Sequence, residues 1–216
     1  MNSYVDKLGL DFDPFDADAG DQGFFAGGGR QALLQQLMEQ ACHSGALLAV
    51  TGEPGAGKST VARQLARDLG RDAVCAVIPA TLFMDQAGFL DQVHAALGLP
   101  EASDSSEVLA FANDLALDAR TLVLVIDDAQ ELASDVYNLL TRMLKRNPGG
   151  GLAVVLFGEP QLSPLLQRSL PPGLLLNLRE FTLPRFSSED SLDYVRFKLA
   201  SAGFRKPLPL GGSELG

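Results

Sequence analysis

Residues 52–59 read Gly-Glu-Pro-Gly-Ala-Gly-Lys-Ser, which is the G-x-x-x-x-G-K-[ST] spacing of a loop that holds nucleotide phosphates. A short apolar run, residues 46–50, precedes the loop, and apolar residues at helical spacing follow it over 61–69. Glycines allow a turn tight enough for successive N–H groups to face one phosphate, and the start of a helix adds its positive dipole end. The motif and both flanks therefore predict a strand, a phosphate loop and a helix in that order.

The loop makes specific chemical demands on its last residues. The ammonium group of Lys58 is expected near the β- and γ-phosphates, and the hydroxyl of Ser59 is expected to bind Mg²⁺. The cofactors predicted are thus ATP or ADP with Mg²⁺. The residues predicted to bind the nucleotide here are Gly52, Glu53, Pro54, Gly55, Ala56, Gly57, Lys58, Ser59 and Thr60.

The rest of the chain alternates between strand-like and helical patterns. The β-like runs are 46–50, 73–78, 121–126, 152–157 and 179–183, and the helical segments are 31–42, 61–69, 83–97, a segment after Ser106, 134–146 and Ser187 to Gly203. Continuous apolar runs such as 121–126 are typical of parallel strands that are buried on both faces. The pattern predicts an α/β fold of the P-loop NTPase type, a doubly wound parallel sheet of about five strands flanked by helices.

Ligands bind such sheets at the carboxyl ends of the strands, where Asp127, Asp128 and Gln130 follow the run 121–126. Asp127 is the expected second anchor of Mg²⁺. Asp128 is either a catalytic group that orients or deprotonates the attacking water, or an electrostatic or capping residue. Gln130 is either a group that positions water or reads the γ-phosphate, or a solvated polar side chain.

Glu159 follows the run 152–157 and is expected in the same crevice, where it would act through water or a basic neighbour because phosphate repels a carboxylate. Arg179 and Arg168 are candidates for an arginine that reaches the nucleotide of a neighbouring subunit, with a solvated surface residue as the alternative. Arg30 could approach the nucleotide from the N-terminal side. His43 and His94 lie in helical segments without a ligand pattern.

Charge and cysteine content narrow the partners and the compartment. The chain has 17 basic and 27 acidic residues, a net charge of −10, which argues against indiscriminate binding of nucleic acid. Its two cysteines, Cys42 and Cys75, show no metal-ligand spacing and favour a reducing cytoplasm. We expect neither a secretory leader at Met1 nor a membrane-spanning run within these 216 residues.

A set of motifs, taken in order, resembles a known family. They are Leu10 to Phe15, Phe24-Phe25, residues 52–59, Val125 to Gln130, Phe157 to Leu162 and Tyr194 to Gly203. This series is similar to that of the ExeA/GspA-type AAA+ ATPases of bacteria, and within them to the ATPase region of DamX-like cell-division proteins. There, such a domain precedes a membrane span and a peptidoglycan-binding domain. The resemblance covers about Asp6 to Gly203.

The resemblance implies that Lys58 and Ser59 bind phosphate and metal and that Asp127 holds the metal. Asp128 stands where many relatives have the catalytic Glu, Glu159 stands where many have Gln, and the lid segment with a nucleotide-sensing arginine is missing. The predicted catalytic set is Lys58 and Asp128, at positions that match the family, together with Arg179 as the candidate arginine named above. The implied setting is the cytoplasmic side of the bacterial inner membrane, with a membrane tether only through segments of a longer natural protein.

Four functions remain open at this point. The first is an ATPase whose nucleotide cycle changes its assembly, as a homo-oligomer or with a partner protein, in envelope, division or secretion work. The second is a scaffold that responds to ATP or ADP with little turnover. A DNA-linked, transposition-type ATPase is disfavoured by the acidic balance. A small-molecule phosphotransferase would need a second substrate pocket, of which the sequence gives no sign.

The chain is expected to divide into four parts. Residues 1–30 form an N-terminal extended segment, 31–185 the P-loop NTPase core, 186–204 a partial helical lid and 205–216 a tail that resembles a linker.

Overall fold

The computed structural model describes residues 3–16, 23–43, 45–100, 104–147 and 151–205. The chain forms two compact units. The larger, which we call the core unit, runs from Ala32 to Pro184, and the smaller, the terminal unit, combines the chain up to Gln31 with the chain from Arg185 onward.

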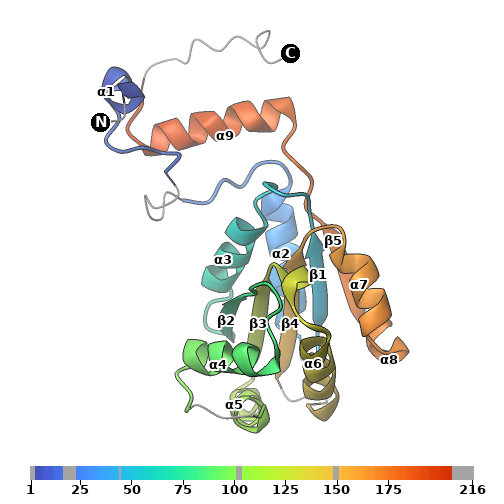
Figure 1. Ribbon diagram of the computed structural model, residues 1–216. Coiled ribbons are helices and arrows are strands. Elements are labelled where there is room, and N and C mark those ends of the chain that lie inside the picture. The colour runs from blue at the N-terminus through green and yellow to red at the C-terminus, as the bar shows by residue number, and fades with distance from the viewer. Residues whose placement is uncertain (1–2, 17–22, 44, 101–103, 148–150, 206–216) are drawn as a thin grey trace. The chain divides into compact units, whose positions relative to one another are not determined.

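The core unit contains a five-stranded sheet in which every pairing is parallel (Figure 1). Its strands are β1 (Leu47–Thr51), β2 (Ala73–Pro79), β3 (Thr121–Asp127), β4 (Leu152–Gly158) and β5 (Leu178–Thr182). They lie side by side in the order β2-β3-β4-β1-β5. The predicted α/β fold with five parallel strands is confirmed.

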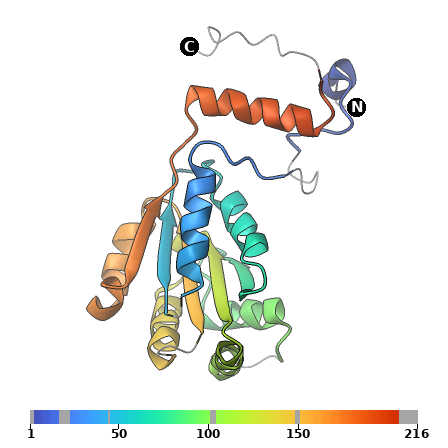
Figure 2. The same cartoon turned by 180° about the vertical axis from the view of Figure 1, so that it is seen from behind.

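Helices cover both faces of this sheet. The helices are α2 (Arg30–Ala41), which enters the core unit at Ala32, α3 (Lys58–Asp68), α4 (Gln86–Leu97), α5 (Ser106–Leu117), the short η1 (Ala129–Glu131), α6 (Ser134–Arg146), α7 (Leu162–Ser169) and α8 (Pro172–Leu175). Figure 2 shows α2 and α3 on one face, and Figure 1 shows α4 and α6 on the other. Two covered faces explain why the central strands are apolar at every position rather than at alternate ones.

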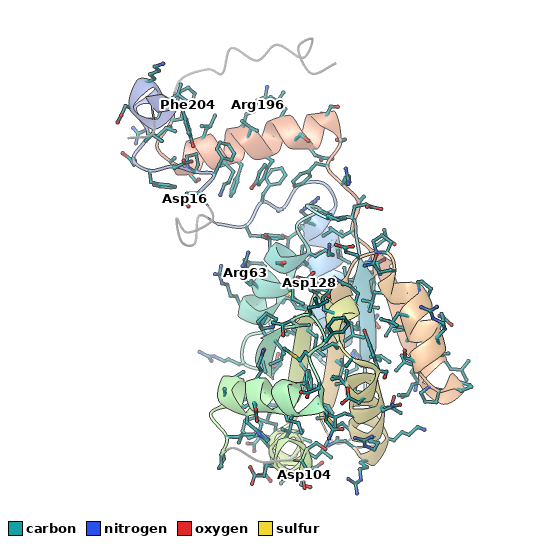
Figure 3. All side chains as sticks on the ribbon, viewed as in Figure 1. Asp16, Arg63, Asp104, Asp128, Arg196 and Phe204 are labelled. Carbon is teal, nitrogen blue, oxygen red and sulfur yellow. The ribbon has the colours of Figure 1, made fainter. Side chains whose placement is uncertain are left out.

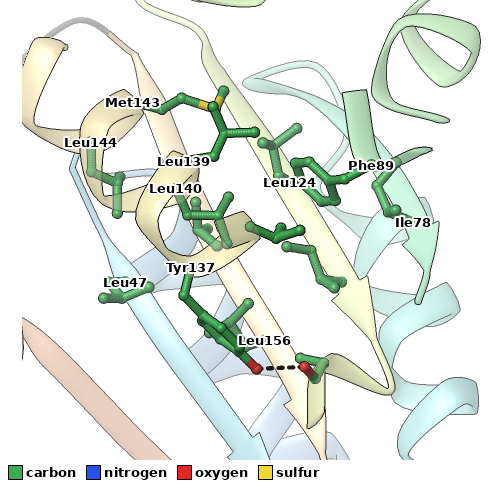
Figure 4. Close-up of a cluster of buried hydrophobic side chains, with 14 of the residues drawn as sticks. Leu47, Ile78, Phe89, Leu124, Tyr137, Leu139, Leu140, Met143, Leu144 and Leu156 are labelled. Carbon is green, nitrogen blue, oxygen red and sulfur yellow. Dashed lines mark hydrogen bonds between the residues drawn. The ribbon is translucent and has the colours of Figure 1, made fainter. Parts of the chain in front are cut away.

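Alternate residues of the strands pack into different layers. On the face of α4 to α6, Leu124 and Leu156 of the sheet join one buried cluster with Phe89, Leu140 and Met143 of the helices (Figure 4). The intervening residues, among them Leu48, Val50, Val123, Val125 and Val155, are also fully buried. A side chain on either face is thus removed from water, which contributes about 1.5–3 kcal/mol for each large apolar residue.

The terminal unit is built around α9 (Ser188–Ser201) and α1 (Ser3–Leu8). Ser187 caps α9, because its hydroxyl accepts a bond from the N–H of Asp190 while the Asp190 carboxylate accepts one from the N–H of Ser187. A small core buries Leu10 against Leu199 and Ala202. The N-terminal segment thus contains the helix α1 and supplies Leu10 to this small core, and neither feature was predicted from the sequence.

Three details of the predicted elements were wrong or missing. The helix expected over 83–97 begins only at Gln86, since Asp85 caps it with a 2.9 Å bond from the N–H of Gly88 and Phe83 has a φ of 60°. The helices α1, α7 and α8 were not predicted. The apolar residues of the segment Ser187 to Gly203 were expected to be buried, but Leu192 and Val195 of α9 are only half-buried.

Among the described residues, we find no helix that combines the length and the hydropathy needed to cross a membrane.

Candidate nucleotide-binding site

The loop between β1 and α3 adopts a conformation that its glycines make possible. Gly55 and Gly57 have φ values of 78° and 92°, in the left-handed region that side chains with a Cβ rarely adopt. Gly52 passes close to other backbone, so that a Cβ at this position would lie 2.8 Å from the carbonyl oxygen of Leu183. No side chain caps the N-terminus of α3, where Gly57 is the cap residue. The first-turn N–H groups are therefore not occupied by a capping side chain.

Lys58 turns its side chain back into the loop. The residue is 7% exposed, and its Nζ donates to the carbonyl oxygens of Gly52 at 3.0 Å and Glu53 at 3.2 Å. The ammonium group is thus held against the loop backbone, where a phosphate cradled by the loop would meet it. Ser59 is half-buried, and Thr60 is exposed.

The strand order places the other predicted polar groups beside this loop. β4 lies between β1 and β3, so the ends of all three strands meet at one edge of the sheet. The N–H of Gly52 donates to the carbonyl oxygen of Gly158 at 3.1 Å, which joins the start of the loop to the end of β4. Figure 3 shows Asp128 at the same edge. The ends of β1, β3 and β4 therefore meet at the edge of the sheet where the sequence predicted a nucleotide site.

Asp127 and Asp128 differ in setting. Asp127 closes β3, is half-buried, and accepts a bond on Oδ1 from the N–H of Asp128 at 3.1 Å. Asp128 is exposed and has a φ of 53°, a strained conformation for a residue with a side chain. The turn at Asp128 separates the two carboxylates, so that one lies in the strand end and the other in solvent.

Gln130 ties Asp128 to β4. Its Nε2 donates to Oδ1 of Asp128 at 3.4 Å, and its Oε1 accepts a 3.1 Å bond from the backbone N–H of Glu159. Gly158 makes room for the amide, because a Cβ there would lie 2.6 Å from Oε1 of Gln130. A hydrogen-bonded chain therefore runs from Gly52 through the end of β4 and Gln130 to Asp128.

These residues fit a magnesium–nucleotide complex. Mg²⁺ is usually held by one or two carboxylates or hydroxyls, phosphate oxygens and water. Ser59 and Asp127 would supply the protein ligands, and the loop with Lys58 would hold the phosphates. Within the described ranges, no group of three or more His, Cys, Asp or Glu residues could hold a metal ion by itself. A site that shares its metal with phosphate needs no such group.

A family model described as an AAA domain matches residues 40–166, which is more than half of the 216 residues. The chain belongs to the AAA domain family. The match includes the phosphate loop, Asp127, Asp128, Gln130 and Glu159.

A curated relative agrees with this assignment. General secretion pathway protein A of Aeromonas hydrophila is 29% identical over 216 residues, which cover 95% of this chain and 39% of the relative. The chain thus spans well under half the length of that relative. The family resemblance seen in the sequence is confirmed at the level of the AAA domain and of similarity to a general secretion pathway A protein, and no comparison addresses a closer relation to DamX-like proteins.

Solved structures support the fold alone. Cdc6p from Pyrobaculum aerophilum superimposes with a TM-score of 0.65 and 17% identity, covering 89% of this chain and 54% of that one. ORC2 of Aeropyrum pernix, in ADPNP–ADP complexes, gives a TM-score of 0.67 and 16% identity, covering 87% and 55%. Drosophila ORC bound to DNA gives a TM-score of 0.51 and 17% identity, covering 79% and 31%.

The predicted arginines lie apart from the site of this AAA domain. Arg179 is exposed on the edge strand β5, level with Leu48 in β1. That is three residues, or about 10 Å, before the end of β1 at Thr51. Arg168 is exposed in the last turn of α7. Neither is brought to the phosphate loop within this chain, and a role toward a second subunit stays a prediction.

Arg30 has a structural setting within the terminal unit. It is 3% exposed, its guanidinium carbon lies 3.5 Å from the ring centre of Phe186, and its Nη1 donates to the carbonyl oxygen of Gly28 at 3.1 Å. Burial lowers its pKa, an effect that the Asp190 carboxylate opposes. These contacts hold the Arg30 side chain against Phe186 and Gly28, and they do not show the expected approach of Arg30 to a nucleotide.

Sequence reasoning missed the roles of Gly158 and of Tyr137. Tyr137 is buried in α6, and its hydroxyl donates to the carbonyl oxygen of Ala129, the residue after Asp128 (Figure 4). A glycine at the end of a strand next to a loop was a usable signal for close approach. The tyrosine gave no such signal, because an apolar helix position predicts burial and not a bond to a particular carbonyl.

Proposed function

We propose that this AAA domain binds ATP with Mg²⁺ at residues 52–60 and hydrolyses it. The support is the edge of the sheet where the phosphate loop, Asp127 and Asp128 meet, joined by the hydrogen-bonded chain through Gly158 and Gln130. When bound, the metal would neutralise charge on the β- and γ-phosphates. Lys58 would add a positive charge there, and the loop N–H groups would hold the phosphate oxygens.

Asp128 would accept a proton from the attacking water, or orient that water, in this proposal. Its exposed side chain is open to solvent, and the bond from Gln130 limits its rotation. The N–H of Glu159 donates to Gln130, and this bond fixes the backbone that carries the Glu159 carboxylate at the end of β4. We assign it an indirect role through water, because direct contact with phosphate would be repulsive.

The biological setting is proposed from the relative. The similarity to a general secretion pathway protein of Aeromonas hydrophila supports work in secretion. A role in the cell envelope or in division is proposed from the resemblance of the sequence motifs alone. Nucleotide binding would change the assembly of the chain with itself or with a partner protein. We also propose that the domain is cytoplasmic and that any membrane tether lies outside these residues.

A scaffold with little turnover is the second candidate, and one observation favours it. Oδ1 of Asp128 already accepts from Gln130, and its side chain is one methylene shorter than Glu, so its reach toward a water at the γ-phosphate is reduced. The DNA-linked ATPase has no supporting contact here, and the net charge of −10 weighs against it.

Binding is tested first, by titrating a fluorescent ATP analogue into the wild type and Lys58→Ala with and without Mg²⁺. We expect affinity to fall by at least tenfold in Lys58→Ala, while Lys145→Ala, an exposed lysine on α6, serves as the matched control. Equal affinity of all three proteins would overturn the proposed site. Phosphate release by the same proteins then separates the ATPase from the scaffold.

A further inference from the structure

The parallel sheet ends at β2 on one side and at β5 on the other (Figure 1 and Figure 2). The two end strands differ in length and in charge. β5 has five residues, of which Arg179 and Glu180 are charged and exposed, whereas the seven residues of β2 include no charged one. Charged side chains on an end strand discourage pairing with a strand of another molecule. β2 lacks this protection.

The hydrogen bonds between β2 and β3 fix which backbone groups of β2 face outward. The N–H of Thr121 donates to the carbonyl oxygen of Asp72 at 3.0 Å. At the other end, the N–H of Ala80 donates to the carbonyl oxygen of Asp127 at 2.9 Å. In a parallel ladder, every second residue directs both its N–H and its C=O at the same neighbouring strand. The even-numbered residues of β2 therefore bond to β3, and the odd-numbered ones face away from it. The outward residues are Ala73, Cys75, Val77 and Pro79.

Three of these residues, Ala73, Cys75 and Val77, form what we call the open edge. Within the described part of the chain, no hydrogen bond reaches their backbone N–H or C=O groups. Ala73 is buried, and Cys75 and Val77 are half-buried, so these groups are partly withdrawn from water, which makes a missing partner costly. β3 already holds β2 extended over Ala73–Pro79. A strand that bonded to the open edge would therefore lose little entropy in ordering β2.

An antiparallel second copy of β2 fits the open edge. In an antiparallel pair, two outward residues that lie opposite each other exchange both of their N–H···O bonds. When Cys75 lies opposite Cys75 of the second copy, Ala73 lies opposite Val77, and all three residues of the open edge take part in both copies. Pro79 has no N–H, so a register that used it would lose a bond. Centring the pair on Cys75 leaves Pro79 beyond the paired residues.

Charge favours pairing through β2 over pairing through β5. A pair centred on the middle of β5 would set Glu180 opposite Glu180 of the other copy, and like charges directly opposite are destabilising. Glu180 is also engaged in its own chain, where it accepts from the hydroxyl of Ser163 at 2.5 Å and from Nε2 of Gln167 at 3.3 Å. Pairing through β2 sets no charged side chains of the strands against each other. The remaining repulsion comes from the net charge of −10 on each copy, which salt screens.

We propose that two copies of this chain pair antiparallel through the open edge of β2, centred on Cys75, and so join their sheets into one. The pairing has two-fold symmetry, and it leaves β5 of each copy at an outer end of the joined sheet. It does not rest on the binding or hydrolysis of ATP proposed above. Because it is tested without nucleotide, its failure and the failure of the proposed function are separate results.

Sedimentation velocity of the full chain, over about a hundredfold range of concentration, should show a monomer that becomes a dimer. Added NaCl should strengthen the association, because it screens the repulsion between acidic copies. Val77→Pro should weaken dimer formation by at least about tenfold, since the N–H of Val77 faces outward and a proline there blocks the edge without removing a bond to β3. Thr182→Pro is the matched control, because the N–H of Thr182 faces outward at β5, and it should stay within about twofold of wild type.

Amide hydrogen exchange of the wild type tests the pairing without a substitution, and it decides the matter if Val77→Pro does not fold. The amides of the open edge should exchange quickly in dilute protein and become protected as the concentration rises. The outward amides of β5, those of Leu178, Glu180 and Thr182, should exchange equally at every concentration.

Several results would overturn the pairing. They are a wild type that stays monomeric at every concentration and salt, a folded Val77→Pro that dimerises as the wild type does, and a dimer in which exchange at the open edge is unchanged. The edge could instead take a strand of another protein, which a peptide of alternating valine and threonine probes. A wild type that stays monomeric, and whose open edge is protected only by this peptide, would assign the edge to such a strand and contradict the pairing of two copies.

Discussion

The side-chain oxygen of Gln130 accepts a 3.1 Å hydrogen bond from the backbone N–H of Glu159, which joins the turn after β3 to the end of β4. The same amide donates to Asp128 at 3.4 Å. The Gln130 side chain therefore fixes the Asp128 carboxylate, which we propose acts on the attacking water, relative to the end of β4. That end of β4 also contacts the phosphate loop through Gly52.

Replacing Gln130 by Leu should separate binding of ATP from its hydrolysis. The N–H of Glu159 would lose its partner, which costs about 1–3 kcal/mol where the group is buried and less where water reaches it. We expect affinity for ATP to change by less than about threefold and phosphate release to fall by at least about tenfold, as loss of a positioning residue predicts. Gln161→Leu, at an exposed glutamine before α7, is the control. An unaltered rate in Gln130→Leu would contradict the role of the tether.

A methyl group at Gly158 should be costly. The Cβ of Gly158→Ala would lie 2.6 Å from Oε1 of Gln130 and 2.8 Å from a methyl carbon of Leu162, so both side chains would have to move. We expect a loss of about 1–3 kcal/mol in the free energy of unfolding, measured by urea denaturation. Gly173→Ala in α8 has nothing within 4 Å and should be neutral or slightly stabilising. Equal effects of the two substitutions would show that the close approach is unimportant.

Tyr137→Phe tests the support beneath Asp128. The substitution removes the hydroxyl that donates to the carbonyl of Ala129, and it leaves the ring in the core. Losing the bond should cost about 1–2 kcal/mol in unfolding free energy. Phosphate release should fall as well, because Ala129 adjoins Asp128. The matched change Tyr194→Phe, on α9 in the terminal unit, should be close to neutral, and a comparable loss there would argue against a specific role for Tyr137.

Acid should loosen α9 through Asp190. Bonds from the Ser187 hydroxyl and N–H hold the pKa of Asp190 below its ordinary value, and the charge of Arg30 acts in the same direction. A lowered pKa in the folded state means that this stabilisation is present above the ordinary carboxyl pKa and is lost as pH falls through the lowered one.

Amide hydrogen exchange over Ser188–Ser201 measures this effect when the wild type and Asp190→Asn are compared at each pH. The wild type should be better protected near neutral pH, and the two proteins should converge in acid. Asp193→Asn, whose exposed carboxylate pairs with Arg196, should show little pH-dependent difference. If the difference in protection between wild type and Asp190→Asn is the same at every pH, the ionised Asp190 carboxylate is not what stabilises α9.

The sequence predicted those parts of the fold that depend on local pattern. The apolar run 121–126 forms a strand, and the loop 52–59 lies between a strand and a helix, as expected. Burial on both faces requires apolar residues at every position, and the tight loop requires glycines, so both features can be recognised in the sequence. Asp127 was likewise placed at a strand end from its position after an apolar run.

What the sequence did not predict depends on contacts between distant residues. The bond between Gln130 and Glu159 requires β3 and β4 to be neighbours, and a lone Gln gives no sign of its partner. The packing of Arg30 on Phe186 joins residues far apart in the chain, so Arg30 was interpreted as a candidate for the nucleotide. The late start of α4 followed from a cap at Asp85 and positive φ at Phe83, which the helical spacing of apolar residues conceals.

Phosphate release at saturating ATP and Mg²⁺ tests the central claim most directly, with wild type, Lys58→Ala and Asp128→Asn measured side by side after each is shown to be folded. We predict steady turnover by the wild type that requires Mg²⁺, and a fall of about 100-fold or more in either variant, as loss of one preorganised charge or base predicts. Asp128→Asn should still bind ATP. A wild-type rate that is indistinguishable from that of Lys58→Ala would contradict an ATPase and leave a nucleotide-binding scaffold.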